Sequence, residues 1–203
     1  SDLTALVGGY TLTNTSASDI TFTSGKSANA ATWANGVSHH LYTADAEPLR
    51  FGDRDWTVAA WVNFTRIGST NEDSVLSKTN RFTAQEVLIG RFQNRLDLTL
   101  FNGATSTVLN LQFPNALPSN GWYFVCARNI AATKTATLVV NETGVSGSYT
   151  GTPGSTSVIF SIGANPVNNN STSPFTGGQI DEVAKWNRAL TNGEILLLYN
   201  GGT

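Results

Sequence analysis

The chain has 203 residues and a formal net charge of −2, with 13% charged and 40% hydrophobic residues, so that 18 Ser, 27 Thr and 20 Asn carry most of its polarity. Its twelve basic residues are scattered without a run, which argues against nucleic acid as a partner, because a phosphate-binding surface needs clustered Lys and Arg. The longest apolar stretches, such as Ile195–Tyr199, are far shorter than the roughly 20 residues that span a bilayer, which argues against membrane insertion.

Short strands with an alternating pattern dominate the sequence in chain order. The first fifty residues are rich in Ser, Ala and Asn, with apolar runs that predict strands at 20–22, 39–42 and 49–51. From Trp56 to Phe64 every second residue is apolar, which predicts a half-buried strand with one inner face. Further β-branched or aromatic segments between turn residues predict strands at 86–92, 96–101, 108–113, 122–128, 136–140, 157–162 and 179–186. Residues 96–100 and 107–111 should pair as a hairpin across Asn102-Gly103.

One short helix is predicted near the C-terminal end. Thr191-Asn192-Gly193-Glu194 has the form of a capping box, in which Thr191 and Glu194 each satisfy a backbone amide of the first turn. Ile195, Leu198 and Tyr199 then share one face, and Asn200-Gly201-Gly202 ends the helix.

About a dozen strands with a single short helix predict an all-β fold, a two-sheet antiparallel jelly-roll sandwich. We expect one domain over residues 1–203. Residues 1–48 either belong to the sandwich or form an arm that docks on a neighbour.

Several segments in a fixed order carry a family pattern. An Asp-Trp-Thr-Val-Ala-Ala-Trp-Val strand is followed by Val-Leu-Ser-Lys, Gly-Trp-Tyr-Phe-Val, Phe-Ser-Ile-Gly and Phe-Thr-Gly-Gly-Gln-Ile-Asp-Glu-Val, and then by Trp-Asn-Arg-Ala-Leu-Thr and Glu-Ile-Leu-Leu-Leu-Tyr-Asn. These segments begin at Asp55, Val75, Gly121, Phe160, Phe175, Trp186 and Glu194. From about residue 49 to 203 the chain resembles the laminin-G-like branch of the concanavalin-A-like lectin and glucanase superfamily.

One segment departs from that pattern. Members of the family often carry Asn-Gly in the turn after a Leu-Tyr-Val strand, whereas Leu138–Gly144 has Asn-Glu-Thr-Gly there. The resemblance implies the sandwich fold. It leaves the ligand open, because this sandwich hosts lectins, adhesion modules, glycan-binding appendages and some hydrolases.

Catalysis is disfavoured by the arrangement of the carboxylates. Glycoside hydrolases of the superfamily use Glu-x-Asp-x-Glu on one strand face, a spacing that points alternate carboxylates into the same cleft. The candidates here are Glu72-Asp73, Asp53-x-Asp55 and Asp181-Glu182, and none of them completes such a set. There is no Gly-x-Ser-x-Gly elbow, and Cys126 lies mid-strand on a face that we expect to be buried. The chain is therefore predicted not to be an enzyme.

Calcium is the cofactor that the resemblance implies most directly. Laminin-G-like sandwiches frequently hold Ca²⁺ at a rim through carboxylate and carbonyl oxygens. Asp181, in the Ile-Asp-Glu segment, is the leading candidate ligand, and Asp53 and Asp55 are weaker ones. Alternatively, Asp181 accepts hydrogen bonds from backbone amides or pairs with Arg188. His39 and His40 should point to opposite faces of a strand, which disfavours a zinc site.

Aromatic and neutral polar residues are the candidates for ligand contact, because a sugar ring packs its apolar face on an aromatic ring. Trp56, Trp122 and Trp186 follow apolar strand patterns and are predicted to lie in the core. Trp61 has the opposite parity and should face the other surface of its sheet. The remaining candidates are Tyr42 and Tyr149, Asn168, Asn169 and Asn170 in the polar loop 165–174, and Trp33. Trp33 is expected to be exposed, and it either contacts a ligand or folds down from its loop over the sheet.

Three functions stay open at this point. The first is a non-catalytic recognition or adhesion module that binds a glycan or a protein surface, displayed on a larger assembly and located outside the cell or on a particle. The second is a structural decoration or appendage subunit of a virus or phage particle, held by capsid or other assembly subunits. The third is a glycoside hydrolase or lyase.

Overall fold

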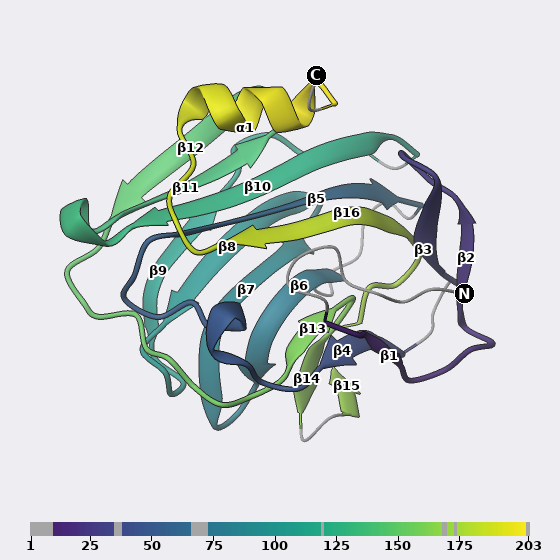
Figure 1. The fold of residues 1–203 in the computed structure, drawn as a ribbon, viewed down its shortest axis with the longest axis horizontal. Helices are drawn as coiled ribbons and strands as arrows, with labels where there is room; N and C mark the ends of the chain where they lie inside the picture. Colours follow the sequence, from purple (N-terminus) through teal and green to yellow (C-terminus); the bar gives the residue numbers. More distant parts are fainter. Residues whose placement is uncertain are drawn as a thin grey trace.

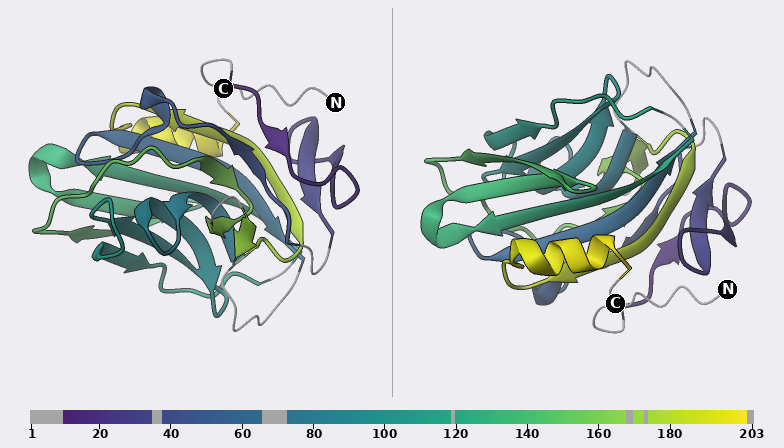
Figure 2. Two further views of the ribbon diagram at one scale, coloured as in Figure 1. Left: turned by 90° about the horizontal axis from the view of Figure 1, so that it is seen from below. Right: turned by 90° about the horizontal axis from the view of Figure 1, so that it is seen from above.

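The computed structural model describes residues 10–34, 38–65, 73–118, 120–167, 170–172 and 174–201. Within these ranges the strands form two seven-stranded sheets and one small hairpin, and every strand pair is antiparallel. The two sheets stack as layers (Figures 1 and 2). The predicted all-β, two-sheet antiparallel jelly-roll sandwich is thereby confirmed.

The strands of each sheet come from distant parts of the sequence. Sheet I has the order β1 (Thr13–Asn14), β4 (Leu41–Thr43), β13 (Phe160–Ile162), β6 (Asp73–Asn80), β7 (Ala84–Phe92), β8 (Arg95–Phe101) and β9 (Thr107–Gln112). Sheet II has the order β12 (Thr143–Ser148), β11 (Thr135–Val140), β10 (Trp122–Ile130), β5 (Trp56–Phe64), β16 (Gly178–Trp186), β3 (Asn29–Trp33) and β2 (Ile20–Ser24). The small hairpin pairs β14 (Asn165–Val167) with β15 (Asn170–Thr172).

The main core lies between the two sheets. Alternate residues of β5, from Trp56 to Phe64, enter it from sheet II, and Val87, Ile89 and Leu98 enter it from sheet I. Phe51 packs edge-on against Trp56, with ring centroids 4.9 Å apart. The inward alternation predicted for this strand is therefore confirmed, but the prediction that the strand is half-buried is wrong, because Thr57, Ala59 and Trp61 on its other face are buried as well. The β8–β9 hairpin across Asn102-Gly103 is confirmed.

A second, smaller apolar layer covers the outer face of sheet II. Its buried members are Ala59, Trp61, Phe124, Cys126, Leu190 and Ile195. The helix α1 (Asn192–Tyr199) lies across this face, above β10, β5 and β16 (Figure 1). Cys126 is fully buried as predicted, and burial raises the pKa of its thiol to about 12. Within the described residues, no helix combines the length and the apolar character needed to cross a membrane.

The predicted capping box begins α1. The Glu194 amide donates to Thr191 Oγ1 at 3.2 Å, and the Glu194 carboxylate accepts from the Thr191 amide at 2.7 Å. Arg188 adds a second hydrogen-bond donor to that carboxylate. These contacts lower the pKa of Glu194 to about 2, with the Arg188 hydrogen bond as the largest cause. The first turn of α1 is thus held by Arg188, which follows the end of β16.

The first fifty residues contribute strands to both sheets. β2 pairs with β3, and β3 pairs with β16. The predicted strands at 20–22 and 39–42 correspond to β2 and β4. The prediction of a strand at 49–51 is wrong, because Glu47–Leu49 form a short 3-10 helix, η1, with Pro48 in its first turn and Leu49 buried at its end. The assignment of residues 1–203 to one domain stays a prediction.

Buried ion pairs support sheet I beneath its loops. Arg91 and Asp73 pair at 2.6 Å, with both side chains about 2% exposed, and the Arg91 guanidinium lies 4.0 Å from the Phe64 ring. Asp73 also accepts from the Thr176 amide at 3.0 Å. Lys78 is fully buried and pairs with Asp45 at 2.7 Å. Each of these charges has a partner, as buried charges require.

Candidate functional site

A groove beside α1 is the candidate functional site. It has a volume of about 790 Å³, which is within the usual range for ligand pockets, and it opens on the outer face of sheet II. We call it the helix groove. Its floor comes from β5, β10 and β16, one wall from the C-terminal end of α1, and the other wall from the turn between β2 and β3 together with Glu182 of β16.

Aromatic rings form the floor and the helix-side wall of the helix groove. Trp61 on β5 stacks against Tyr199 of α1, with centroids 5.8 Å apart and planes 22° apart. Phe124 on β10 packs against both rings, at 5.5 and 5.9 Å. Trp186, half-buried on β16, extends the aromatic lining. An aromatic surface of this kind fits the apolar face of a sugar ring.

A β-bulge in β16 shapes the opposite wall. The register of β16 against β5 shifts between Asp181 and Ala184, and Glu182 within the bulge has a φ of 50°. This conformation is uncommon outside glycine, and bulges often re-aim side chains next to functional sites. The bulge leaves Glu182 exposed on the groove wall.

Asp181 holds the β2–β3 turn in place. Its Oδ2 accepts the Ser27 amide at 2.9 Å, and its Oδ1 accepts the Glu182 amide at 2.9 Å. Gly25 permits this close approach, because a Cβ there would lie 2.5 Å from Asp181 Oδ2. Asp181 therefore positions Lys26 and Ser27, which line the groove.

Lys26 lies over the aromatic floor. Its Nζ is 4.2 Å from the centroid of the Trp61 ring, within the range of a cation–π contact. The lysine side chain is exposed, so this contact leaves it free to move off the ring when a ligand arrives. The groove thus combines stacked rings with the polar ends of Lys26, Ser27, Glu182 and Asn200.

The structure treats the predicted tryptophans differently. Trp61 faces the outer surface as predicted and lines the helix groove, with 8% of it exposed. The expectation that Trp33 is exposed is wrong, since it is 2% exposed and belongs to the core between the sheets. Trp33 lies on β3, its Nε1 donates to the His39 carbonyl at 2.9 Å, and Gly163 has no Cβ to collide with its ring. Trp56 is in the core as predicted.

Two further tryptophans were predicted for the core, and that prediction is wrong. Trp122 and Trp186 are half-buried and pack against the outer layer under α1 instead. Trp122 pairs with Asn63 and Trp186 pairs with Thr57, and both partners lie on the face of β5 that points away from the core. Because paired residues of neighbouring strands share a face of the sheet, both tryptophans lie on the outer face.

The remaining predicted ligand residues lie away from the helix groove. Tyr42 is half-buried on β4 of sheet I, with the His40 ring 5.6 Å away, and Tyr149 is buried with its hydroxyl donating to Asn129. Asn168 and Asn169 lie outside the described residues, and Asn170 begins β15. The β14–β15 hairpin lies on the side of the molecule opposite α1 (Figure 1). The structure therefore does not bring these residues together with Trp61.

The predicted calcium ligands are separated as well. Asp181 lies opposite Trp61, whereas Asp55 precedes the start of β5, where it accepts the Ala131 amide, and Asp53 pairs with Lys134 at 3.5 Å. In the part of the chain that the structure describes, no three His, Cys, Asp or Glu side chains gather as a metal-binding group. Of the alternatives for Asp181, the amide contacts are present, and the pairing with Arg188 is wrong because Arg188 pairs with Glu194. Calcium binding stays a prediction, which melting with and without a chelator would test.

Sequence reasoning did not find the wall of the helix groove formed by Lys26, Ser27 and Glu182. The Asp181–Ser27 hydrogen bond joins residues 154 positions apart, so no local sequence pattern predicts it. The available signal was Gly25 at the end of a short strand, since glycine in or near a strand often marks a close approach.

Comparison with known proteins places this geometry in a family. The model of the concanavalin A-like lectin/glucanases superfamily matches residues 34–196. The chain belongs to this superfamily. Among curated protein sequences, none matches the chain.

Solved structures share the superfamily fold with this chain at low sequence identity. The binding domain of Paraclostridial Mosquitocidal Protein 1 superposes with a TM-score of 0.76 at 14% identity, covering 98% of this chain and 49% of that one. The receptor-binding domain of botulinum neurotoxin type G gives 0.67 at 15%, covering 95% and 47%. This chain therefore spans about half the length of these toxin domains.

A third solved structure is matched over nearly its full length. Domain 4 of AbnA, an extracellular arabinanase from Geobacillus stearothermophilus solved in complex with arabinotriose, gives a TM-score of 0.73 at 19% identity. The match covers 98% of this chain and 93% of that one. At these identities the likeness establishes the fold alone.

Proposed function

We propose that this chain is a non-catalytic recognition module that binds a short glycan segment in the helix groove. The observation that carries the proposal is the groove itself, about 790 Å³ with Trp61, Trp186 and Tyr199 along it and polar side chains at its rim. A sugar needs this combination, because its ring faces are apolar and its edges carry hydroxyls. The shared fold with an arabinanase domain solved with arabinotriose supports the same ligand class.

The electrostatics of the helix groove suit a neutral ligand. Lys26 and Glu182 bring opposite charges to its rim, and Ser27 and Asn200 add neutral donors and acceptors. Hydroxyl groups can bond to each of these. A cationic ligand would be repelled by Lys26, and an anionic ligand would be repelled by Glu182.

Binding without turnover is proposed because of the carboxylates. Glycoside hydrolysis uses a pair of carboxyl groups about 5 to 9.5 Å apart. The described residues that line the helix groove include one carboxylate, Glu182. A location outside the cell or on a particle surface, where such glycans are met, is part of the proposal.

The test is a glycan array followed by calorimetry on the best ligand, with arabinotriose in the panel. Trp186→Ala should weaken binding about tenfold, because it removes one ring contact worth roughly 1 to 1.5 kcal/mol. Trp122→Ala is the matched control, since Trp122 is also half-buried in the outer layer and does not line the groove. It should bind like the wild type.

The outcomes separate the three functions. Absence of binding across the array, together with copurification with a virus or phage particle, would favour a structural decoration subunit over the module proposed here. Turnover of any polysaccharide would show a hydrolase or lyase. Equal loss of binding in both tryptophan variants would move the site away from the helix groove.

A further inference from the structure

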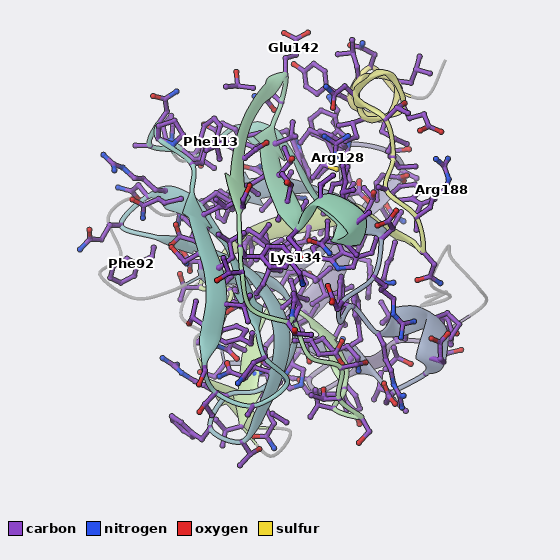
Figure 3. All side chains as sticks on the ribbon, turned by 90° about the vertical axis from the view of Figure 1, so that its left-hand side faces the viewer. Phe92, Phe113, Arg128, Lys134, Glu142 and Arg188 are labelled. Carbon is purple, nitrogen blue, oxygen red and sulfur yellow. The ribbon has the colours of Figure 1, made fainter. Side chains whose placement is uncertain are left out.

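A second hollow lies at the other end of α1. It has a volume of about 410 Å³ and opens over β10, β11 and β12 on the same outer face of sheet II. Figure 3 views this end of the molecule, with α1 seen end-on, Arg128 beside it and Glu142 at the tip of the β11–β12 turn. We call this hollow the Arg128 pocket.

Arg128 is held in one orientation by the chain that leads into α1. Its Nη1 donates to the Leu190 carbonyl at 2.7 Å. Its Nε is buried and makes no hydrogen bond to any described residue. Among the described residues, Arg128 has no carboxylate partner, whereas Arg50 pairs with Asp45 and Arg91 with Asp73.

Those two paired arginines show which atoms Arg128 leaves unused. Arg91 donates through Nε and Nη2 to Asp73, at 3.2 and 2.6 Å. Arg50 donates through Nε and Nη2 to Asp45, at 3.1 and 2.5 Å. In Arg128 the bond to Leu190 takes Nη1, so the Nε and Nη2 edge that the other two present to a carboxylate stays without one. Arg128 thus brings to the pocket lining a positive charge that pairs with no carboxylate of the described residues, and a guanidinium binds a ligand carboxylate through charge-assisted hydrogen bonds.

The rest of the lining combines neutral polar side chains with the apolar side chains of Val139, Ile195 and Leu196. The Thr137 and Ser146 hydroxyls lie 2.9 Å apart on neighbouring strands, and Asn141 and Asn192 complete the polar surface. Glu142, exposed on the rim, offsets the charge of Arg128. A ligand with one negative charge and several hydroxyls fits this lining better than a dianionic phosphate does.

We propose that the Arg128 pocket binds an acidic monosaccharide unit, with the sugar carboxylate on Arg128 and its hydroxyls on the Thr137–Ser146 pair. This is a site apart from the helix groove, since the two hollows share no lining residue among those described. Its ligand class is also different, an acidic sugar rather than a neutral glycan segment. The proposal stands whether or not the helix groove binds a glycan.

In the experiment, the full chain is titrated with glucuronate, galacturonate and N-acetylneuraminate, and binding is monitored through the backbone amide signals in NMR spectra. Methyl galactoside is the neutral probe, and acetate and an Asp-containing tripeptide are the acidic probes that lack a sugar ring. The proposal expects one acidic sugar to bind at least tenfold more tightly than methyl galactoside and than acetate. It also expects that affinity to fall as salt is added. Equal binding of acetate, or tighter binding of the peptide, would overturn it.

Four variants, one of them a control, locate the site. Arg128→Gln should weaken binding of the acidic sugar at least tenfold, and Glu142→Gln should strengthen it several-fold because it removes the like charge. Arg95→Gln is the matched control, an exposed arginine on β8 of sheet I that bonds to Gln112, and it should leave binding unchanged. Thr137→Val tests the hydroxyl pair if Arg128→Gln proves too unstable to titrate. Wild-type affinity in both Arg128→Gln and Thr137→Val, or weaker binding in Glu142→Gln, would overturn the proposal.

Discussion

The two faces of sheet II differ in how completely they are covered. On the inner face, residues such as Trp56 and Val62 are 1% and 0% exposed beneath the whole of sheet I. On the outer face, a single helix of eight residues covers the sheet, and Trp61 in the same strand β5 lines an open groove. The comparison teaches that the inner face holds the fold together, whereas the outer face has space left for a ligand at each end of α1.

The largest expected effect comes from emptying the inner face. Trp56→Ala should lower the free energy of unfolding by about 3–5 kcal/mol, because it removes a fully buried indole and leaves a cavity. Trp122→Ala on the outer face should cost only about 2 kcal/mol, since Trp122 is half-buried. Urea denaturation of both variants measures the difference. Equal losses would contradict the contrast between the faces.

The next effect tests a buried polar side chain next to strand β4 of sheet I. His40 directly precedes β4, and its ring centroid lies 5.6 Å from that of Tyr42. It is 1% exposed, and neither ring nitrogen has a hydrogen-bond partner among the residues that the structure describes. Burial, with a smaller contribution from His39, lowers the pKa of His40 from 6.5 to about 4.

The sign of the pH effect follows from where the proton binds. Between pH 6.5 and about 4, the unfolded chain protonates this histidine and the folded chain does not, so stability falls as the pH is lowered through that window. The loss should approach about 3 kcal/mol near pH 4 and be absent above pH 6.5. Urea denaturation at pH 7 and pH 4.5 measures it. His40→Leu should remove this part of the pH dependence, and an unchanged profile in that variant would assign it to other groups.

The smallest effect concerns the helix that walls both hollows. Thr191→Ala removes the side-chain acceptor of the Glu194 amide and should cost about 1 kcal/mol of unfolding free energy. Thr191→Ser keeps a hydroxyl and should recover most of that loss. Weaker glycan binding by Thr191→Ala at a temperature where the variant is fully folded would show that α1 positions the helix groove.

Much of this organisation could be predicted from the sequence, because it depends on local periodicity. The alternation along Trp56–Phe64 separates the inner from the outer face, and the Thr191–Glu194 spacing locates the start of α1. The strand Asn29–Trp33 escaped prediction, since Ala30, Ala31 and Thr32 are small and give no apolar alternation to mark the face on which Trp33 lies.

The two hollows could not be predicted from local pattern. The helix groove depends on the Asp181–Ser27 contact and on the bulge at Glu182, which only the pairing of distant strands creates. The Arg128 pocket depends on the Leu190 carbonyl, which accepts a hydrogen bond from Arg128 Nη1 and so fixes the guanidinium in place. The motif order identified the superfamily, and it carried no information on these contacts.

The indole N–H resonances of the five tryptophans give the most direct test of the contrast between the two faces. On titration with the best ligand from the glycan array, we expect the Trp61 and Trp186 signals to shift with the same saturation curve. Trp33 and Trp56, enclosed between the sheets, should stay in place, and Trp122 should move little. Saturable shifts at Trp33 or Trp56 without shifts at Trp61 and Trp186 would contradict a glycan site in the helix groove.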